Sequence, residues 1–147
     1  MGTDENSSPA ALFVSKEHLP SVALELRDND SLYFDMLSCL TGVDHGPKAG
    51  KMEVIYHLYS VPYGLPLALK VELKRPEDET EMPEVPSVAS VWQTADWHER
   101  EAFDLLGIRF ASHPDLRRIL LPADWEGHPL RKDYEHQEEY HGITVKY

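Results

Sequence analysis

Charged side chains are concentrated in one otherwise apolar stretch of this 147-residue chain, from Trp97 to Tyr134. The stretch opens with an acidic–basic–acidic triplet, and basic residues then alternate with carboxylates along it: Glu99, Arg100, Glu101, Asp104, Arg109, Asp115, Arg117, Arg118, Asp124, Glu126, Arg131, Lys132 and Asp133. Paired carboxylates can act as general acid and base, whereas arginines that alternate with carboxylates form ion pairs of fixed geometry. Catalysis would also require a nucleophile or a metal, so the other reactive residues decide between these two interpretations.

No reactive set of residues accompanies these charges in the sequence. Cys39 lies among apolar residues, which favours a small core residue over a thiolate. Residues 98–102 begin like the H-E-x-x-H zinc motif but contain no second histidine, and Ser112 is only a sequence neighbour of His113. Neither glycine-rich nucleotide motif, G-x-G-x-x-G or G-x-x-x-x-G-K-[ST], is present. We therefore predict no catalytic residue, no cofactor-binding residue and no metal ligand, and the chain is interpreted as a non-catalytic interaction module.

The overall charge and the cysteine count exclude several classes of partner. A formal net charge of −12 argues against nucleic acid and against anionic lipid, because both would require a basic face. One cysteine allows neither an internal disulfide nor an iron–sulfur cluster, which takes about four thiolates, and it favours a reducing compartment. No apolar run approaches the roughly 20 residues of a spanning helix, and the acidic N-terminal residues have no apolar core, so we do not expect them to act as a signal peptide. We therefore expect no direct membrane insertion.

The first elements that must position the charged stretch follow from hydrophobic spacing. Residues 11–14 form a short apolar run, which predicts an edge strand. Leu19, Val22, Ala23 and Leu26 recur at helical spacing, which predicts a helix over residues 19–26 with Pro20 in its first turn. Residues 32–43 predict a helical turn followed by a strand.

Two strands and a second helix complete this prediction. Residues 52–59 are apolar on both faces, as a central strand is, and residues 67–73 alternate, so the two predict an antiparallel hairpin. Residues 75–86 are acidic and contain three prolines, which predicts a solvated loop. Apolar positions from Val88 to Leu106 predict a helix capped by Ser87 and ended by Gly107, with a break near residues 94–96 left open.

Glu99 lies on the apolar stripe of this second helix, between Ala95 and Leu106. A buried carboxylate is tolerated only with a paired cation and hydrogen bonds, and the candidate cations are Arg117, Arg118 and Arg131. The alternative is a helix rotated far enough for solvent to reach Glu99. The sequence leaves both arrangements open.

These elements predict an α+β fold, a two-layer sandwich in which helices pack on one face of a small mixed or antiparallel sheet. Residues 1–10 are expected to form a disordered arm, residues 11–134 one domain and residues 135–147 a polar surface tail. The tail contains a group of residues that is better explained by solvent exposure than by a metal site: His136, Glu138, Glu139 and His141.

The charged stretch resembles the signature of the 30-kDa subunit of respiratory complex I, known in bacteria as the C subunit of NADH–quinone oxidoreductase. The pattern reads Glu99-Arg100-Glu101, two residues, Asp104-Leu105-Leu106, six residues, His113, three residues, Arg117, one residue, Ile119-Leu120. It continues as H-P-D-L-R-R-I-L-L-P-x-D-W-x-G-x-P-L-R-K-D-Y. Weaker resemblance covers residues 11–134, with departures at Cys39 and His45 and in the short tail after Tyr134.

The resemblance implies a structural role in a large enzyme. It implies a two-layer α+β domain in the hydrophilic arm, peripheral on the cytoplasmic side of the inner (plasma) membrane, next to the 49-kDa subunit and other quinone-module subunits. That complex passes electrons from NADH through FMN and iron–sulfur clusters to quinone and translocates protons, whereas this chain is expected to hold no cofactor. The expected signature and interface residues are Glu99, Arg100, Glu101, Asp104, His113, Pro114, Asp115, Arg117, Arg118, Asp124, Trp125, Gly127, Arg131, Lys132 and Asp133.

Our leading hypothesis for these residues is that Arg117, Arg118 and Arg131 pair with Asp104, Asp115 and Asp133, within the chain or across a subunit interface. The same signature also fits subunits of related ferredoxin- or hydrogen-linked membrane complexes. A third function, a small free-standing hydrolase or metal-binding protein, would use Cys39 or the histidines.

Overall fold

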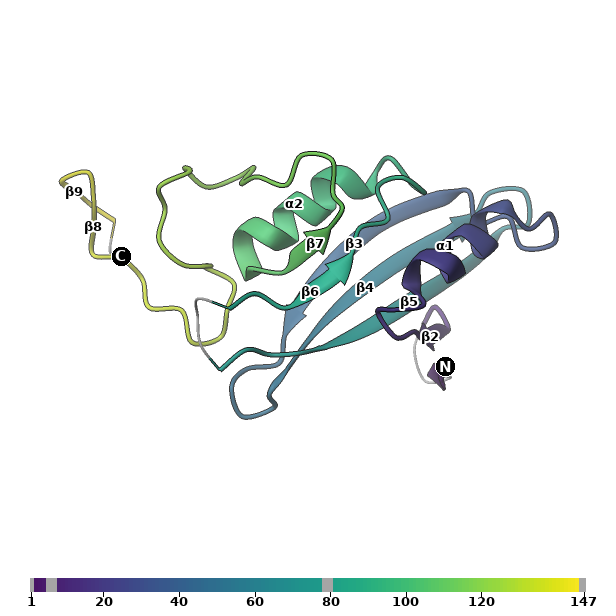
Figure 1. Ribbon diagram of the computed structural model, residues 1–147, viewed down its shortest axis with the longest axis horizontal. Coiled ribbons are helices and arrows are strands. Elements are labelled where there is room, and N and C mark those ends of the chain that lie inside the picture. The colour runs from purple at the N-terminus through teal and green to yellow at the C-terminus, as the bar shows by residue number, and fades with distance from the viewer. Residues whose placement is uncertain (1, 5–7, 78–80, 146–147) are drawn as a thin grey trace.

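A five-stranded mixed sheet carries two helices on one of its faces (Figure 1). The computed structural model describes residues 2–4, 8–77 and 81–145. The strand order is β1 (Gly2–Asp4), β2 (Ala11–Phe13), β5 (Leu65–Lys74), β4 (Lys51–Ser60) and β3 (Met36–Asp44). The helices are α1 (Leu19–Asp28) and α2 (Ala95–Leu106). The predicted two-layer α+β arrangement is confirmed.

Two short pairs of strands lie outside the main sheet. β6 (Glu84–Pro86) and β7 (Arg109–Ala111) pair in parallel, and β8 (Glu139–Tyr140) and β9 (Ile143–Thr144) form a hairpin near the C-terminus. The first pair joins the two segments that flank α2 in the sequence, so it holds both ends of that helical region together.

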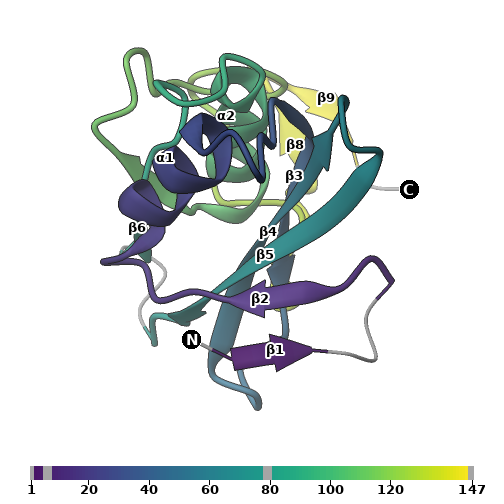
Figure 2. The same ribbon diagram turned by 90° about the vertical axis from the view of Figure 1, so that its right-hand side faces the viewer.

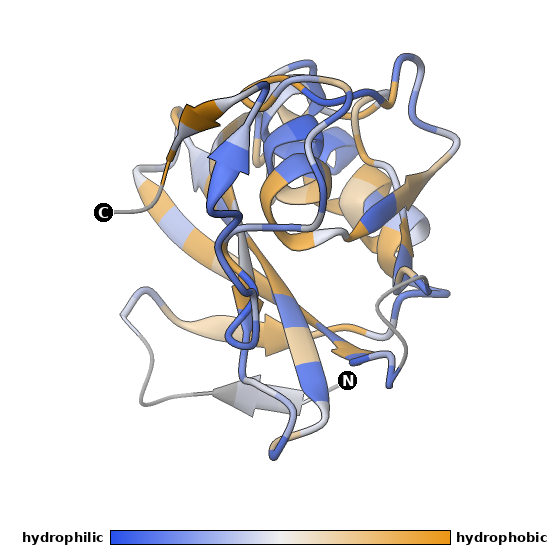
Figure 3. Cartoon of the chain, turned by 90° about the vertical axis from the view of Figure 1, so that its left-hand side faces the viewer, coloured by the Kyte–Doolittle hydropathy of each residue, from blue (hydrophilic) through white to orange (hydrophobic). Residues whose placement is uncertain are grey.

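The centre of the main sheet is the predicted antiparallel hairpin of β4 and β5. Its register places Met52 opposite Leu73 and Val54 opposite Val71. These side chains point into the layer between sheet and helices and are fully buried or nearly so. Residues between them point to the other face, and Figure 3 shows the resulting alternation of hydrophobic and hydrophilic residues along the long strands.

Helix α1 follows its sequence pattern closely. Leu19, Ala23 and Leu26 are its buried residues, and Pro20 stands in its first turn, where a missing backbone N–H costs nothing. Asn29 ends the helix with its backbone N–H still bonded to the carbonyl oxygen of Glu25. The predicted helix is therefore confirmed, two residues longer at its C-terminal end.

The N-terminal residues differ from the predicted disordered arm. Residues 2–4 form β1, which pairs antiparallel with β2 and places Gly2 opposite Phe13 (Figure 2). β2 also pairs in parallel with β5, with Leu12 opposite Leu69, so it is an inner strand and the predicted edge position is wrong. Residues 1 and 5–7 of the predicted arm lie outside the described residues.

The helical turn predicted at the start of residues 32–43 is wrong, because strand β3 already begins at Met36. Leu37 and Leu40 are three residues apart, a helical spacing, yet both are buried on the same face of a strand. A β-bulge between Leu37 and Cys39 adds one residue and makes this possible. Because of the extra residue, buried positions that would be two residues apart in a regular strand are three apart in the sequence, which resembles the spacing of a helix.

The predicted solvated loop at residues 75–86 is wrong at both of its ends. Arg75 is only 8% exposed, and Val85 in β6 is fully buried opposite Phe110 of β7. The acidic character of the segment hid one apolar residue that pairs with a strand far away in the sequence. Residues 78–80 lie outside the described residues.

Helix α2 starts later than its apolar stripe suggests. Val88 and Trp92 are buried, but they precede the helix, whose first residue is Ala95. Trp92 donates its indole N–H to the carbonyl oxygen of Phe34, which fixes the turns before the helix against the sheet. The open question of a break near residues 94–96 is thus answered, and Gly107, with φ 68°, ends the helix as predicted.

Gly42 in β3 allows α2 to lie close to the sheet. A Cβ atom at this position would stand 2.4 Å from Cδ1 of Leu106 and 3.3 Å from Cδ1 of Ile108. Both are tips of buried side chains, so any added atom would have to push them aside.

We predict that Gly42→Ala lowers the free energy of unfolding by about 1–3 kcal/mol, the usual cost of overpacking a core. Chemical denaturation of the purified chain measures this. Thr41→Ala, at the exposed neighbouring position, is the matched control and is expected to change stability by less than about 1 kcal/mol. Equal stability of Gly42→Ala and the parent chain would show that the helix does not depend on this close approach.

Candidate functional site

We call residues 97–134 the signature segment. It consists of most of α2, the short strand β7 and a long segment without regular structure, residues 112–134, which passes back around α2 and which we call the returning chain. After β7 the chain passes over α2 and then along its C-terminal end (Figure 1). Residues 112–134 contain no helix or strand, so hydrogen bonds other than those of regular structure must define their path.

The carboxylate of Asp104 is the central acceptor of the signature segment. One oxygen lies 2.8 Å from Nη1 of Arg118, and the other accepts three backbone N–H groups, from Ile119, Leu120 and Leu121, at 3.0, 2.7 and 2.9 Å. Burial by itself would raise the pKa of Asp104, but these donors outweigh it and hold the pKa below its usual range. Asp104 therefore stays ionised and fixes the returning chain against α2.

The carbonyl groups at the C-terminal end of α2 are also satisfied by the returning chain. The carbonyl oxygen of Asp104 accepts from Nδ1 of His128 at 2.9 Å, and that of Leu105 accepts from the backbone N–H of Leu130 at 2.9 Å. The carbonyl oxygen of Leu106 accepts from Nε of Arg131 at 2.8 Å. These groups would otherwise be unpaired in a buried helix end, and a cation there also opposes the negative end of the helix dipole.

Gly107 is required where these contacts meet. A Cβ atom there would lie 2.6 Å from both Arg131 and His128, and its φ of 68° already disfavours other residues. Burial lowers the pKa of His128, with the positive charges of Arg131 and Arg118 adding to this effect. A neutral His128 with its proton on Nδ1 suits the bond to the Asp104 carbonyl.

Arg100 holds the returning chain by its backbone. Its Nε and Nη2 atoms donate to the carbonyl oxygens of Arg117 and Arg118 at 3.2 and 3.4 Å. Arg117 itself pairs with Asp115 at 2.9 Å, but both side chains are more than half exposed. An exposed pair of this kind contributes little to stability, so Arg117 and Asp115 stay available for other contacts.

A second buried carboxylate, which sequence reasoning missed, joins the signature segment to the sheet. Asp44, at the end of β3, lies 2.9 Å from Nε of Arg75 and accepts the backbone N–H of Lys132 at 2.9 Å. Arg75 also pairs with Asp133. Burial would raise the pKa of Asp44, but the backbone donors and Arg75 lower it below its usual range. Asp133 thus pairs with an arginine from outside the set of Arg117, Arg118 and Arg131.

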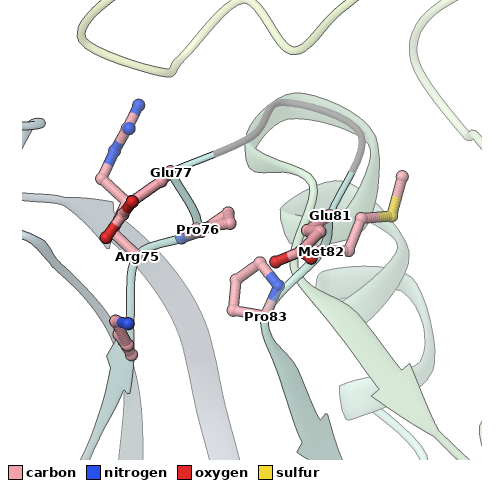
Figure 4. A pocket seen from close by; sticks show the side chains of 7 residues that line it. Arg75, Pro76, Glu77, Glu81, Met82 and Pro83 are labelled. Carbon is pink, nitrogen blue, oxygen red and sulfur yellow. The ribbon is translucent and has the colours of Figure 1, made fainter.

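A surface hollow of about 460 Å³ lies beside Arg75 (Figure 4). The residues that line it are Lys74, Arg75, Pro76, Glu77, Glu81, Met82 and Pro83. It combines two cations with two carboxylates, and its arginine is engaged by Asp44 and Asp133. We therefore assign no ligand to it.

Glu99 is fully buried, yet neither arrangement that the sequence left open is correct. Instead of an arginine, the hydroxyl of Ser87 and the backbone N–H of Val88 donate to its two oxygens, at 2.6 and 2.8 Å. Burial raises the pKa of Glu99 to about 7, the negative charge of Asp96 adds to this, and the two donors only partly oppose it. Glu99 thus ties the segment before α2 to the helix.

His113 packs beside Glu99 with its side chain fully buried. Its Nε2 atom lies 3.1 Å from the carbonyl oxygen of Asp96 and 3.8 Å from the Glu99 carboxylate, while Nδ1 accepts the backbone N–H of Asp115 at 3.0 Å. An acceptor role at Nδ1 requires the proton on Nε2. His113 therefore connects the turn after β7 to the start of α2.

The C-terminal residues contact the signature segment through Asp124. Its carboxylate accepts from the hydroxyl of Tyr140 at 2.7 Å and lies 2.9 Å from Nε2 of His141. Trp125 donates its indole N–H to the hydroxyl of Tyr134 at 3.1 Å. The described part of the tail lies on the surface, and β8 and β9 give it a defined path up to residue 145.

The remaining predicted residues take less constrained positions. Glu101, Pro114 and the side chain of Lys132 are exposed, and Gly127 occupies a turn with φ 77°. Cys39 is half-buried in β3 rather than in the core, at a shallow groove that also includes His98 and Glu101.

Within residues 2–4, 8–77 and 81–145, no group of three or more His, Cys, Asp or Glu residues is arranged to hold a metal ion. The two helices of this described part are both too short to cross a membrane.

Comparison with known proteins identifies relatives along nearly the whole chain. The family model described as "Respiratory-chain NADH dehydrogenase, 30 Kd subunit" matches residues 12–140. The chain is 51% identical over 129 residues to the C subunit of the NADH-quinone oxidoreductase of Chlorobium phaeobacteroides, covering 87% of this chain and 74% of that protein. It is 44% identical over 149 residues to the corresponding C subunit of Chloroherpeton thalassium, covering 99% of this chain but only 59% of that protein.

The fold also matches a solved structure. A chain from the membrane-bound sulfane sulfur reductase, described as an archaeal respiratory membrane complex, superimposes with a TM-score of 0.72. The match covers 86% of this chain and 71% of the other, at 24% sequence identity. At this identity the likeness concerns the fold alone.

The buried position of Glu99 predicts an unusual dependence of stability on pH. The folded chain raises the pKa from 4.5 to about 7, so it binds this proton more tightly than the unfolded chain. The contribution of Glu99 to the free energy of unfolding is therefore greatest below pH 4.5 and is lost as the pH rises to about 7. Across that range the loss amounts to about 3 kcal/mol.

Glu99→Gln does not titrate and is expected to abolish this loss. Its amide oxygen can accept from Val88 and its NH₂ group can donate to the hydroxyl oxygen of Ser87, which then acts as the acceptor. Chemical denaturation of both proteins between pH 5 and 8 measures their free energies of unfolding. The difference between the two values at each pH isolates the effect of Glu99, because the other titrating groups contribute equally to both proteins. Glu101→Gln, an exposed change in the same helix, is the control and should leave the profile unchanged. Parallel profiles for Glu99→Gln and the parent chain would contradict a buried, protonated Glu99.

Asp104→Asn is expected to lower the free energy of unfolding by about 3–5 kcal/mol, because it removes the charge that compensates Arg118 and turns one acceptor into a donor. Asp115→Asn breaks the exposed pair with Arg117 and should cost less than about 1 kcal/mol. Urea denaturation of the two variants measures both values. Similar losses for the two would refute the central role of Asp104.

Proposed function

We propose, because the chain belongs to the family of the respiratory-chain NADH dehydrogenase 30-kDa subunit, that it is a non-catalytic structural subunit of a proton-translocating NADH:quinone oxidoreductase. The resemblance predicted from the signature is confirmed by the match over residues 12–140 and by the relatives named as C subunits of that enzyme. In this proposal the chain lies in the hydrophilic arm on the cytoplasmic side of the membrane, against the 49-kDa-type subunit and its neighbours in the quinone module.

One observation about the geometry carries the structural role. Buried charged residues of the signature segment hold the chain itself: Asp104 pairs with Arg118, and Arg131 donates to the carbonyl oxygen of Leu106. A side chain that is occupied in this way is poorly suited to act on a substrate, but it makes the surrounding surface rigid. A rigid surface loses little conformational entropy when a partner binds, which favours stable assembly.

In this proposal the electrons pass from NADH through FMN and iron–sulfur clusters to quinone in neighbouring subunits. The chain itself contributes a fixed docking surface and holds none of these groups. Arg117 and Asp115, exposed on the returning chain, are the signature residues that we propose to face the partner.

A subunit of a ferredoxin- or hydrogen-linked membrane complex is the second candidate. The fold is compatible with it, since a respiratory complex that is named as a sulfane sulfur reductase contains a chain of the same fold. The names of the more similar relatives favour NADH and quinone. Purification of the native complex through a tag on this chain would separate the candidates, by testing reduction of quinone with NADH, with reduced ferredoxin and with H₂.

The proposed role predicts that Arg118→Ala lowers the amount of assembled complex several-fold. The change leaves Asp104 buried without its cation, which typically costs about 3–5 kcal/mol and loosens the returning chain. Activity per assembled complex should stay unchanged, because this chain is not proposed to touch an electron carrier. Native gels and NADH–quinone activity of solubilised membranes measure both quantities.

Glu99→Ala is the second variant of this test, since it removes the acceptor for Ser87 and Val88. Arg109→Ala is the matched control, because its pair with Glu84 is exposed and Arg109 is not among the residues that we propose to face the partner. Normal amounts of fully active complex with both Arg118→Ala and Glu99→Ala would disprove the structural role.

A further inference from the structure

Exposed apolar side chains gather at one end of the main sheet. Asp44 and its contacts with Arg75 and Lys132 lie at the other end. The tip of the β4–β5 hairpin and the loop between α1 and β3 lie side by side at the end with the exposed apolar side chains (Figures 1 and 2). They carry five large side chains that are each 36–58% exposed, and we call them the hairpin-tip patch: Tyr33, Met36, Tyr59, Val61 and Tyr63. Tyrosine and methionine are enriched in protein interfaces, so this composition suggests a contact surface.

Hydrogen bonds hold the two loops of the hairpin-tip patch together. The backbone N–H of Val61 donates to Oδ1 of Asp35 at 2.9 Å, and the hydroxyl of Tyr63 donates to the carbonyl oxygen of Asp30. Met36 stands opposite Tyr59 in the β3–β4 register. The patch is therefore ordered before any partner arrives, which lowers the entropic cost of binding.

Tyr33 adopts a backbone conformation that tyrosine rarely takes. Its φ is 40°, in the left-handed region, and the residue is 42% exposed, so it gains little from burial. The backbone N–H of Tyr33 bonds to the carbonyl oxygen of Asn29 and that of Phe34 to the carbonyl oxygen of Leu26, so the turn after α1 holds Tyr33 in this conformation. The strain places an aromatic ring at the margin of the patch.

The two segments that form the hairpin-tip patch carry negative charge only. Residues 29–36 and 59–66 contain no lysine, arginine or histidine, while Asp30 and Asp35 are exposed. A second copy of this chain would bring the same carboxylates together, and an anionic membrane would repel them. A protein surface with an apolar centre and lysine or arginine at its margin complements both the apolar and the acidic residues.

We propose that the hairpin-tip patch docks a neighbouring subunit of the same complex through such a basic-rimmed apolar surface. This inference rests on the proposed function for the identity of the complex, but not for the existence of the patch. It adds a second contact surface, separate from the signature segment.

Replacement of the native subunit by tagged variants in cells tests the proposal. Val61→Glu places a charge in the apolar centre, and Asp30→Lys reverses the charge of the rim. Each is expected to lower the assembled fraction of the tagged chain by about fivefold or more, as the loss of a central contact does. Ile143→Glu and Glu139→Lys, the same changes on the exposed C-terminal hairpin, are the matched controls and should assemble normally.

Tyr33→Asn separates docking from folding. Asparagine tolerates a positive φ better than tyrosine, so the purified variant is expected to melt no earlier than the parent chain. The complex should nevertheless assemble less well, because the ring is lost. A photo-crosslinker at position 61 is expected to label one other subunit, next to lysine or arginine residues.

Wild-type assembly of both Val61→Glu and Asp30→Lys would overturn the proposal. If Arg118→Ala or Glu99→Ala still lowers assembly in the same cells, the proposed function survives that failure. If neither variant lowers assembly, both proposals fail. Two sedimentation results would also overturn the proposal: a dimer of the wild-type chain, or its binding to phosphatidylglycerol vesicles, if Val61→Glu abolishes that behaviour. In either case the patch would bind a second copy of the chain or a membrane instead of a neighbouring subunit.

Discussion

The buried C-terminal end of α2 is the constraint on which the path of residues 107–134 depends. A helix leaves its last carbonyl groups without partners, and here the sheet and the returning chain keep water away from them. His128, Leu130 and Arg131 satisfy three of these carbonyls in succession, and Gly107 provides the turn and the space that they need. A segment without regular structure thereby acquires a single path.

Three buried carboxylates stabilise this arrangement in different ways, and the number and charge of their donors explain the difference. Asp104 has three backbone donors and Arg118, and Asp44 has two backbone donors and Arg75, so both remain ionised. Glu99 has one hydroxyl and one backbone donor and no cation, so burial prevails and its pKa rises to about 7. Asp104 and Glu99 are thus only five residues apart in one helix, yet Asp104 is ionised at neutral pH whereas Glu99 is about half protonated.

For a subunit of a large enzyme, these internal contacts define two rigid surfaces. One is the returning chain around α2, where exposed Arg117 and Asp115 remain after the buried residues are engaged. The other is the hairpin-tip patch at the opposite end, where the strained Tyr33 lies among apolar neighbours. Both surfaces are ordered by hydrogen bonds between segments far apart in the sequence, as a scaffold requires.

The sequence by itself determined the family, the α+β class, helix α1, the β4–β5 hairpin and the end of α2 at Gly107, because local spacing and a dense signature carry that information. It did not reveal the bulge in β3, since one inserted residue imitates a helical period. It also could not assign the partners of the charges: Asp44, Arg75 and Ser87 lie outside the signature segment and reach it only in three dimensions. Tertiary structure decided that Glu99 is buried without an arginine, because only the packing of α2 against residues 87–88 sets which donors its carboxylate meets.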